Sequence, residues 1–278
     1  MDDLRIITLV EDTAGGRGLL GEHGLAFWIE CGEARILFDT GQGHVMRHNA
    51  QQLGVPLETV NSIVLSHGHY DHTGGLLDTL RASLSANVYA HPAALKPKFV
   101  RNANGTSRPA GVSSMDEATI RELTDPLWTQ GPTEIAPGVH LTGPVPRRTS
   151  YEDTGGDFFL DPQCAKADDL IDDQAAFIET PRGIVVVLGC AHSGVINTLQ
   201  YIEQLTEGQP IHTVMGGMHL HHASPERLDR TMLALAKMNI SRFMPCHCTG
   251  MDAIVRLWNE FPSQCHSCLT GTTLVIDR

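Results

Sequence analysis

Four side chains that can bind metal fall within six residues, directly after an apolar run. The run is Ile63-Val64-Leu65, and the stretch that follows is Ser66-His67-Gly68-His69-Tyr70-Asp71-His72. Val64 and Leu65 have the character of a buried strand, and Gly74-Gly75 lead into an apolar segment, 76–80, that favours a helix. The sequence therefore predicts a ligand cluster on a strand-to-helix turn, where a rigid scaffold presents side chains into a cleft.

The spacing of these four side chains suits two adjacent metal ions. His67 and His69 are two residues apart and point the same way if the strand continues. Asp71 and His72 lie on the turn and aim at a neighbouring point. Two adjacent ions can lower the pKa of a bound water, and they can stabilise both the attacking and the leaving oxygen of a displacement reaction. The pattern predicts imidazoles for one ion, and a carboxylate with an imidazole for the other.

This His-x-His-x-Asp-His pattern after a hydrophobic strand resembles the signature of the metallo-β-lactamase superfamily. An earlier stretch, Leu37-Phe38-Asp39-Thr40-Gly41, is similar to that superfamily's first Asp motif. The resemblance implies an α/β (α+β) fold, the αββα sandwich, in which two mixed β-sheets face each other and helices cover the outer faces. It also implies that Asp39 supports the metal ligands through hydrogen bonds. The alternative is a polar loop that happens to contain three histidines.

Composition limits the class of protein. The chain has 278 residues, 41% of them hydrophobic, and a formal net charge of −12. No apolar run is long enough to span a membrane, and the acidic charge argues against a nucleic-acid groove. The start, Met1-Asp2-Asp3, lacks the features of a secretory signal. We expect a single domain over residues 1–278, a cytoplasmic location and seven reduced cysteines.

Strand and helix patterns recur in both halves of the chain. A capping box at 114–117 predicts a short helix ending at Leu123, and residues 150–173 are expected to cross the surface. Strands are expected at 5–10, 25–31, 34–38, 63–65, 87–90, within 134–143, and at 175–180, 183–188, 211–215, 242–244 and 274–276, and further helices at 44–53, 195–205, from Ser224-Pro225 and at 251–261.

One superfamily motif is missing. Many members carry a histidine ligand in a Gly-His turn, but here Gly143 is followed by Pro144-Val145-Pro146. The resemblance implies that His192 replaces this ligand and that His247 is the last histidine ligand of the pattern. Cys190 stands where the superfamily has a bridging carboxylate. Because a thiolate binds zinc well, Cys190 is a candidate ligand, and packing beneath the turn is the alternative.

The implied site can now be stated as a whole. One ion is held by His67, His69 and His192, and the other by Asp71, His72 and His247. Zinc is favoured for both divalent ions, with manganese or iron as alternatives. Asp71 and His219 are the expected catalytic residues, and His219 is alternatively a ligand or a donor to one. A separate structural zinc is a weaker hypothesis, held by Cys246, Cys248, Cys265 and Cys268.

Cations are concentrated in one segment of this acidic chain. Residues 93–113 contain four cations and no acidic residue. The segment is either a solvated loop or a lid whose cations meet an anionic substrate. Two arginines after the Gly-Pro-Val-Pro segment add to this set. The candidate substrate-binding residues are Lys96, Lys98, Arg101, Arg108, Arg147 and Arg148.

Three segments together resemble one branch of the superfamily: 189–194 (GCAHSG), 216–220 (GGMHL) and 245–250 (PCHCTG). Its members are metal-dependent hydrolases related to the archaeal 7,8-dihydropterin-6-methyl-4-(β-D-ribofuranosyl)aminobenzene-5'-phosphate synthase. The resemblance implies hydrolysis of a small anionic ester, phosphodiester or lactone by a metal-activated water. The alternatives are a transferase of the synthase type, and a metal-binding sensor or effector with little turnover. Homo-oligomerisation is left open.

Overall fold

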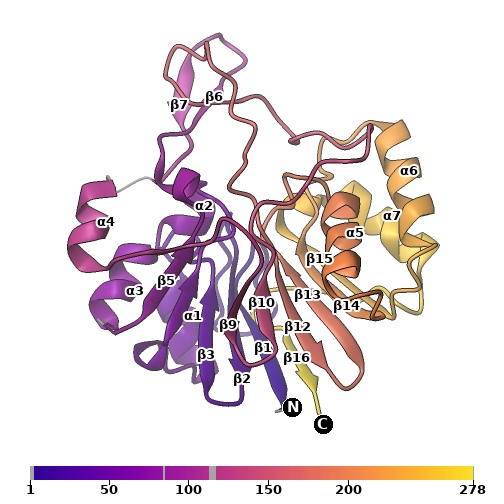
Figure 1. Cartoon of the computed structure of the whole chain (residues 1–278), viewed down its shortest axis with the longest axis horizontal. Helices are drawn as coiled ribbons and strands as arrows, with labels where there is room; N and C mark the ends of the chain where they lie inside the picture. The colour runs from indigo at the N-terminus through magenta and orange to yellow at the C-terminus, as the bar shows by residue number, and fades with distance from the viewer. Residues whose placement is uncertain (1–2, 84, 113–116, 278) are drawn as a thin grey trace.

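The computed structural model describes residues 3–83, 85–112 and 117–277. Two β-sheets pack face to face, and helices cover both outer faces (Figure 1). This is the αββα sandwich expected from the sequence, so the predicted fold class is confirmed. The capping box expected at 114–117 lies largely outside the described residues. No helix in the described ranges is both long and apolar enough to cross a membrane.

The first sheet has seven strands in the order β16-β1-β2-β3-β4-β5-β8. β3, β4, β5 and β8 are parallel, whereas β16, β1 and β2 pair antiparallel. The strands are β1 (Leu4–Val10), β2 (Ala26–Cys31), β3 (Ala34–Phe38), β4 (Ser62–Val64), β5 (Asn87–Ala90), β8 (Leu127–Trp128) and β16 (Thr273–Ile276). The helical segments of this half are α1 (Met46–Leu53), η1 (Leu57–Thr59), α2 (Tyr70–Thr73), α3 (Leu76–Ala82), η2 (Pro92–Leu95) and α4 (Glu117–Leu123).

The second sheet has six strands in the order β15-β14-β13-β12-β10-β9, and β13, β14 and β15 are parallel. The strands are β9 (Thr133–Ala136), β10 (Val139–Leu141), β12 (Ala176–Thr180), β13 (Gly183–Leu188), β14 (Ile211–Gly217) and β15 (Arg242–Cys246). The helical segments are α5 (Val195–Leu205), α6 (Pro225–Leu235), η3 (His247–Thr249) and α7 (Met251–Glu260). The segment 134–143, expected to form a turn and one strand, belongs to a hairpin of two strands, β9 and β10.

Strand β13 shows how sequence and layers correspond. Every residue of this strand is buried. Val185 and Val187 face the core between the sheets, whereas Ile184, Val186 and Leu188 pack in the outer core with α5, α6 and α7. Because successive side chains of a strand point to opposite faces, a central strand covered on both sides must be apolar throughout.

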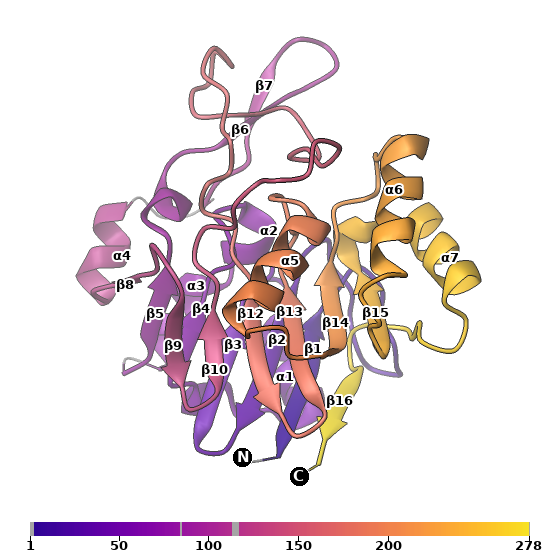
Figure 2. The ribbon, with the colours of Figure 1, turned by 45° about the vertical axis from the view of Figure 1, so that its right-hand side comes forward.

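A small third sheet stands apart from the sandwich. Its order is β11-β6-β7, formed by β6 (Phe99–Arg101), β7 (Ser107–Pro109) and β11 (Phe158–Phe159). Figure 2 shows it above the sandwich, on the side where α2 lies. The two segments expected as a loop or lid and as a surface excursion therefore pair with each other through β6 and β11.

Candidate metal centre

The histidines gather where parallel strands of both sheets end. In the first sheet Asp39 follows β3, and the segment 66–72 follows β4. In the second sheet His192, His219 and His247 follow the neighbouring strands β13, β14 and β15. Because the carboxyl ends of adjacent parallel strands lie at one edge of a sheet, these side chains meet at one end of the sandwich.

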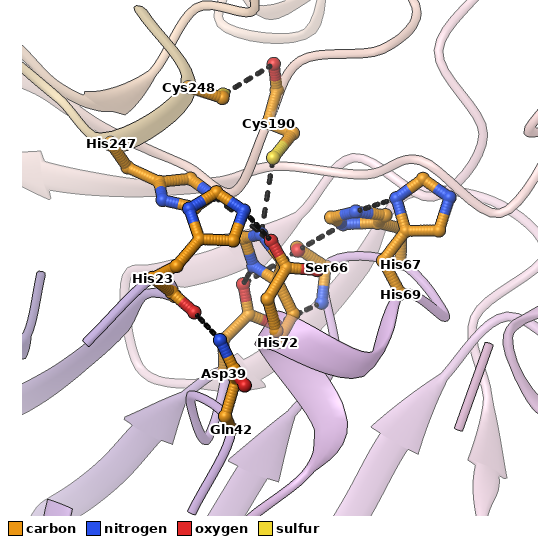
Figure 3. Close-up of polar contacts among 12 residues, drawn as sticks. His23, Asp39, Gln42, Ser66, His67, His69, His72, Cys190, His247 and Cys248 are labelled. Carbon is orange, nitrogen blue, oxygen red and sulfur yellow. Dashed lines mark hydrogen bonds and ion pairs between the residues drawn. The ribbon is translucent and has the colours of Figure 1, made fainter. Parts of the chain in front are cut away.

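Asp39 lies beneath the cluster and is fully buried. Its Oδ1 accepts from the backbone N–H of Ser66 at 2.7 Å, and its Oδ2 accepts from Ser66 Oγ and His72 Nδ1, both at 2.7 Å. Ser66 Oγ in turn lies 2.9 Å from Nδ1 of His67 (Figure 3). A carboxylate only accepts, so this network places hydrogens on Nδ1 of His67 and His72 and leaves their Nε2 lone pairs free for a metal.

The first three-histidine set is His67, His69 and His192. One ligand nitrogen from each lies within 4.8 Å of the others. His67 Nε2 lies 2.9 Å from His69 Nδ1, and His192 Nδ1 lies 2.7 Å from the carbonyl oxygen of Thr154, to which it donates. Burial lowers the pKa of all three imidazoles, that of His69 to about 3. They are therefore neutral near pH 7, which is the state that binds metal.

The backbone at Gly68 is held close to its neighbours. A Cβ at this position would overlap the carbonyl oxygen of Ala94, so only glycine permits this approach. The N–H of Gly68 also donates to Oδ2 of buried Asp172 at 2.7 Å. The peptide between the two histidines is thus fixed on both sides.

Cys190 and His192 both point into the cluster. Alternation along a continuing strand places the two side chains on one side, but the chain does not continue as a strand, because Ala191 has φ of 53°. Cys190 Sγ lies 3.1 Å from His72 Nε2, so this thiol lies within the cluster. His67, His72 and Cys190 form another group whose ligand atoms lie within 4.8 Å of one another.

The second expected set, Asp71, His72 and His247, also converges. Asp71 Oδ2 lies 3.8 Å from His72 Nε2 and 3.4 Å from His247 Nε2. Burial opposes the charge on Asp71, but the surrounding imidazoles outweigh it and lower the pKa of this carboxyl. Asp71 is therefore ionised and available as a hard oxygen ligand.

Two further residues of the second sheet lie beside these groups. His219 packs against His192, with 4.2 Å between ring centroids, and its Nε2 lies 3.2 Å from the carbonyl oxygen of Gly155. Cys248 belongs with Cys190 and His247 to one group of possible ligands. Cys246, by contrast, is buried in the core between the sheets with Cys268, and Cys265 is in the outer core. Cys265 thus lies in a different core from Cys246 and Cys268, which argues against a structural zinc held by all four cysteines.

The donor set fits a divalent metal. His192 Nε2 and His247 Nε2 are buried and make no hydrogen bond within the described part of the chain. Such buried nitrogens are costly unless a further partner satisfies them. A cation held between imidazoles, a carboxylate and a thiol supplies that partner.

The cluster forms the floor of a pocket of about 730 Å³. His69, Asp71, Cys190, His192 and His247 reach it, whereas His67 and His72 are fully buried below. The apolar part of the lining comes from Tyr70, Val100 and Phe158 and from Ile254 and Trp258 of α7. The ring of Phe158 lies 4.6 Å from that of His69 and 5.2 Å from that of His192, measured between centroids.

Of the six cations expected to meet a substrate, all of them described, Arg108 alone lines this pocket. Lys98 is a correction to the expectation: it is 1% exposed, and its Nζ lies 2.8 Å from Asp168 and 2.9 Å from Asp172. The other four also lie elsewhere. Arg101 stacks over Phe159, Arg147 donates to the carbonyl oxygen of Asp169, and Lys96 and Arg148 are exposed away from the metal cluster.

Two residues that the sequence reasoning missed belong to the cluster. Asp12 follows β1, and His23 lies in the glycine-rich turn before β2. Both line the pocket. The available signal was an Asp shortly after an apolar strand, the same kind of position that Asp39 occupies.

Comparisons with known proteins agree with this geometry. The sequence model described as the metallo-beta-lactamase superfamily matches residues 20–247. The 7,8-dihydropterin-6-methyl-4-(beta-D-ribofuranosyl)-aminobenzene-5'-phosphate synthase of Methanocaldococcus jannaschii is 29% identical over 94% of this chain and 92% of its own. An uncharacterized protein of the same organism is 32% identical, over 91% of this chain and 93% of its own.

A crystal structure of a metal-dependent hydrolase of the beta-lactamase superfamily is also similar. It superposes with a TM-score of 0.85 at 31% identity, over 99% of this chain and 100% of that one. Fold, ligand pattern and sequence thus agree. The chain belongs to the metallo-β-lactamase superfamily.

Proposed function

We propose that the protein is a dinuclear metal-dependent hydrolase of a small anionic ester, phosphodiester or lactone. The family fold implies that a divalent metal is bound. The observation that carries the proposal is the position of the ligands: five of them reach the floor of an open pocket. Structural metal sites are closed by four protein ligands, whereas catalytic sites keep a position open to substrate or water.

The residues divide into two neighbouring sets. His67, His69 and His192 would hold one ion, and Asp71, His72 and His247 the other. When bound, such a pair supplies Lewis acidity and a water of lowered pKa. Cys190 Sγ, 3.1 Å from His72 Nε2, would lie between the sets. Imidazole and thiolate ligands favour zinc, and manganese or iron remain alternatives.

His219 is the proposed proton donor to a leaving group. It lines the pocket next to His192, and its Nδ1 is buried and makes no hydrogen bond to any described residue. A nitrogen without a partner inside a pocket is suited to exchanging a proton with a bound substrate.

The pocket supports a substrate with an anionic group and an apolar body. Asp71 and four other proposed ligands line it, and Tyr70, Phe158 and Trp258 add apolar surface. Arg108 places its guanidinium 6.0 Å from the centre of the Tyr70 ring. That guanidinium would pair with a carboxylate or phosphate at the pocket mouth.

A transferase of the synthase type is the second candidate. The similarity to the named synthase over most of both chains favours it. In that reaction the metals would stabilise a leaving diphosphate while an aryl amine attacks a pterin methyl group. A metal-binding sensor or effector is the third candidate, and the open floor of the site argues against it.

The experiment is an assay of metal-loaded protein on a panel of phosphodiesters, lactones and thioesters. We expect turnover of at least one class, and loss of that turnover in His67→Ala. A parallel reaction supplies a dihydropterin methyl diphosphate and an aryl amine. If the protein forms product from that pair but turns over no substrate of the panel, the transferase proposal replaces the hydrolase proposal. If neither reaction shows turnover, the sensor or effector is the remaining candidate.

A further inference from the structure

His23 is held firmly against the metal cluster although it lies in a turn. Its carbonyl oxygen accepts from the side-chain amide of Gln42 (Figure 3). The next residue packs on α2: a Cβ at Gly24 would lie 2.6 Å from the carbonyl oxygen of Asp71. Leu25 N–H donates to the same oxygen at 3.2 Å. The backbone that carries His23 is therefore fixed to the residue expected to bind the second ion.

Asp12 connects His23 to His247. Its Oδ1 lies 2.8 Å from His247 Nδ1, and its Oδ2 lies 3.2 Å from His23 Nδ1. The two rings lie side by side, with 5.0 Å between centroids (Figure 3). Because a carboxylate only accepts, each Nδ1 carries the hydrogen, and in the neutral ring each Nε2 carries a lone pair.

Both Nε2 atoms then face one carboxylate oxygen. Asp71 Oδ2 lies 3.4 Å from His23 Nε2 and 3.4 Å from His247 Nε2. When both rings are neutral, these three atoms are all acceptors, and they repel unless a proton or a metal ion lies between them. In a tetrahedral site with bonds of 2.0–2.1 Å, neighbouring ligand atoms are about 3.3 Å apart. The two separations of 3.4 Å, from Asp71 Oδ2 to His23 Nε2 and to His247 Nε2, match that value, whereas the distance to His72 Nε2 is longer, at 3.8 Å.

We propose that His23 Nε2 is an additional protein ligand of the second metal ion, and that Asp12 orients both imidazoles. This inference rests on the proposed function, because it requires the second ion. His23 lies outside the His-x-His-x-Asp-His segment and before the first Asp motif, so the superfamily pattern does not include it. Its side chain is 55% exposed, so it would bind the ion from the solvent side, opposite the buried His72.

The test measures metal binding directly. Chelated wild-type protein and His23→Ala are titrated with zinc against a chromogenic chelator. We expect the second ion to bind about 10- to 100-fold more weakly in the variant, a loss at least as large as that caused by removing a residue that orients a ligand. The first ion should bind as in wild type. Bound cobalt should also change its visible spectrum, because that spectrum reports the ligand set. His23→Gln, which keeps a polar side chain, should show the same loss.

Two variants serve as comparisons. His44→Ala removes an exposed imidazole from the same region, and its metal affinities should equal those of wild type. Asp12→Asn keeps one acceptor oxygen for two Nδ1–H groups, so it should weaken the second ion less than His23→Ala. Thermal unfolding of each chelated variant verifies that it is folded.

The outcomes separate the two proposals. If wild type binds two ions and both His23 variants bind the second within about twofold of wild type, His23 is not a ligand. Unchanged metal affinity with reduced turnover would assign His23 to proton transfer and would also overturn the inference. Wild type that binds a single ion would remove the dinuclear function, and this inference with it.

Discussion

Replacing Lys98 by methionine should destabilise the protein strongly, although this residue does not line the pocket. Its ammonium is fully buried between Asp168 and Asp172, at 2.8 and 2.9 Å. Methionine fills a similar volume but leaves two buried carboxylates without their cation. Removing one partner of a buried ion pair costs about 3–5 kcal/mol, because the remaining charge is uncompensated. We therefore expect the free energy of unfolding to fall by that amount.

The assay is urea unfolding of chelated protein, followed by circular dichroism. Lys96→Met is the matched control, because Lys96 is exposed two residues away, and its effect should stay within about 0.5 kcal/mol. Since Asp172 also accepts from the N–H of Gly68, Lys98→Met should weaken the ion held by His67 and His69 as well. A loss below about 1 kcal/mol would refute the reasoning.

Three further outcomes are expected. Cys190 should resist alkylation in metal-loaded protein and react after chelation; equal rates in both states would remove it from the ligand set. Asp71→Ala and His247→Ala should each retain about one ion per chain by elemental analysis, and two retained ions would contradict their assignment. Burial raises the pKa of Asp173 from 3.8 to about 6, so its charging costs stability as the pH rises from about 4 to 6. At 1.36 kcal/mol per pH unit the cost is about 3 kcal/mol. Asp173→Asn in chelated protein should lack this fall in unfolding free energy, and an unchanged pH profile would contradict the assignment.

The segment 66–72 was predictable because its chemistry is local. Four ligand residues within one turn and an apolar strand before it specify both the cluster and its support. Asp39 followed from the resemblance of the segment 37–41 to the superfamily's first Asp motif. The strands themselves were predictable because covered strands such as β13 are apolar throughout.

Contacts between distant segments were not predictable in the same way. Asp12, His23 and His247 meet only because β1 and β2 pair, and because η3 follows β15 at the same end of the sandwich. Lys98 appeared to be free because the acids that neutralise it come 70 and 74 residues later. A cation with no acidic residue near it in the sequence can therefore still have an acidic partner in the fold, as Lys98 does.

Backbone conformation decided one question that the sequence left open. Alternation along a strand linked the directions of Cys190 and His192 but did not show whether either reached the site. The positive φ of Ala191 turns the chain between them, and both side chains enter the cluster. A non-glycine residue in this region is uncommon, and no feature of the sequence around it indicates the turn.

The central claim is that this cluster holds two metal ions. The most direct measurement is anomalous diffraction at the metal edge, from crystals of protein purified without added metal. We predict two peaks, one bonded to His67, His69 and His192 and the other to Asp71, His72 and His247. Cys190 Sγ should lie about 2.3 Å from at least one of them if the ions are zinc. A single peak, or peaks away from these residues, would contradict the account.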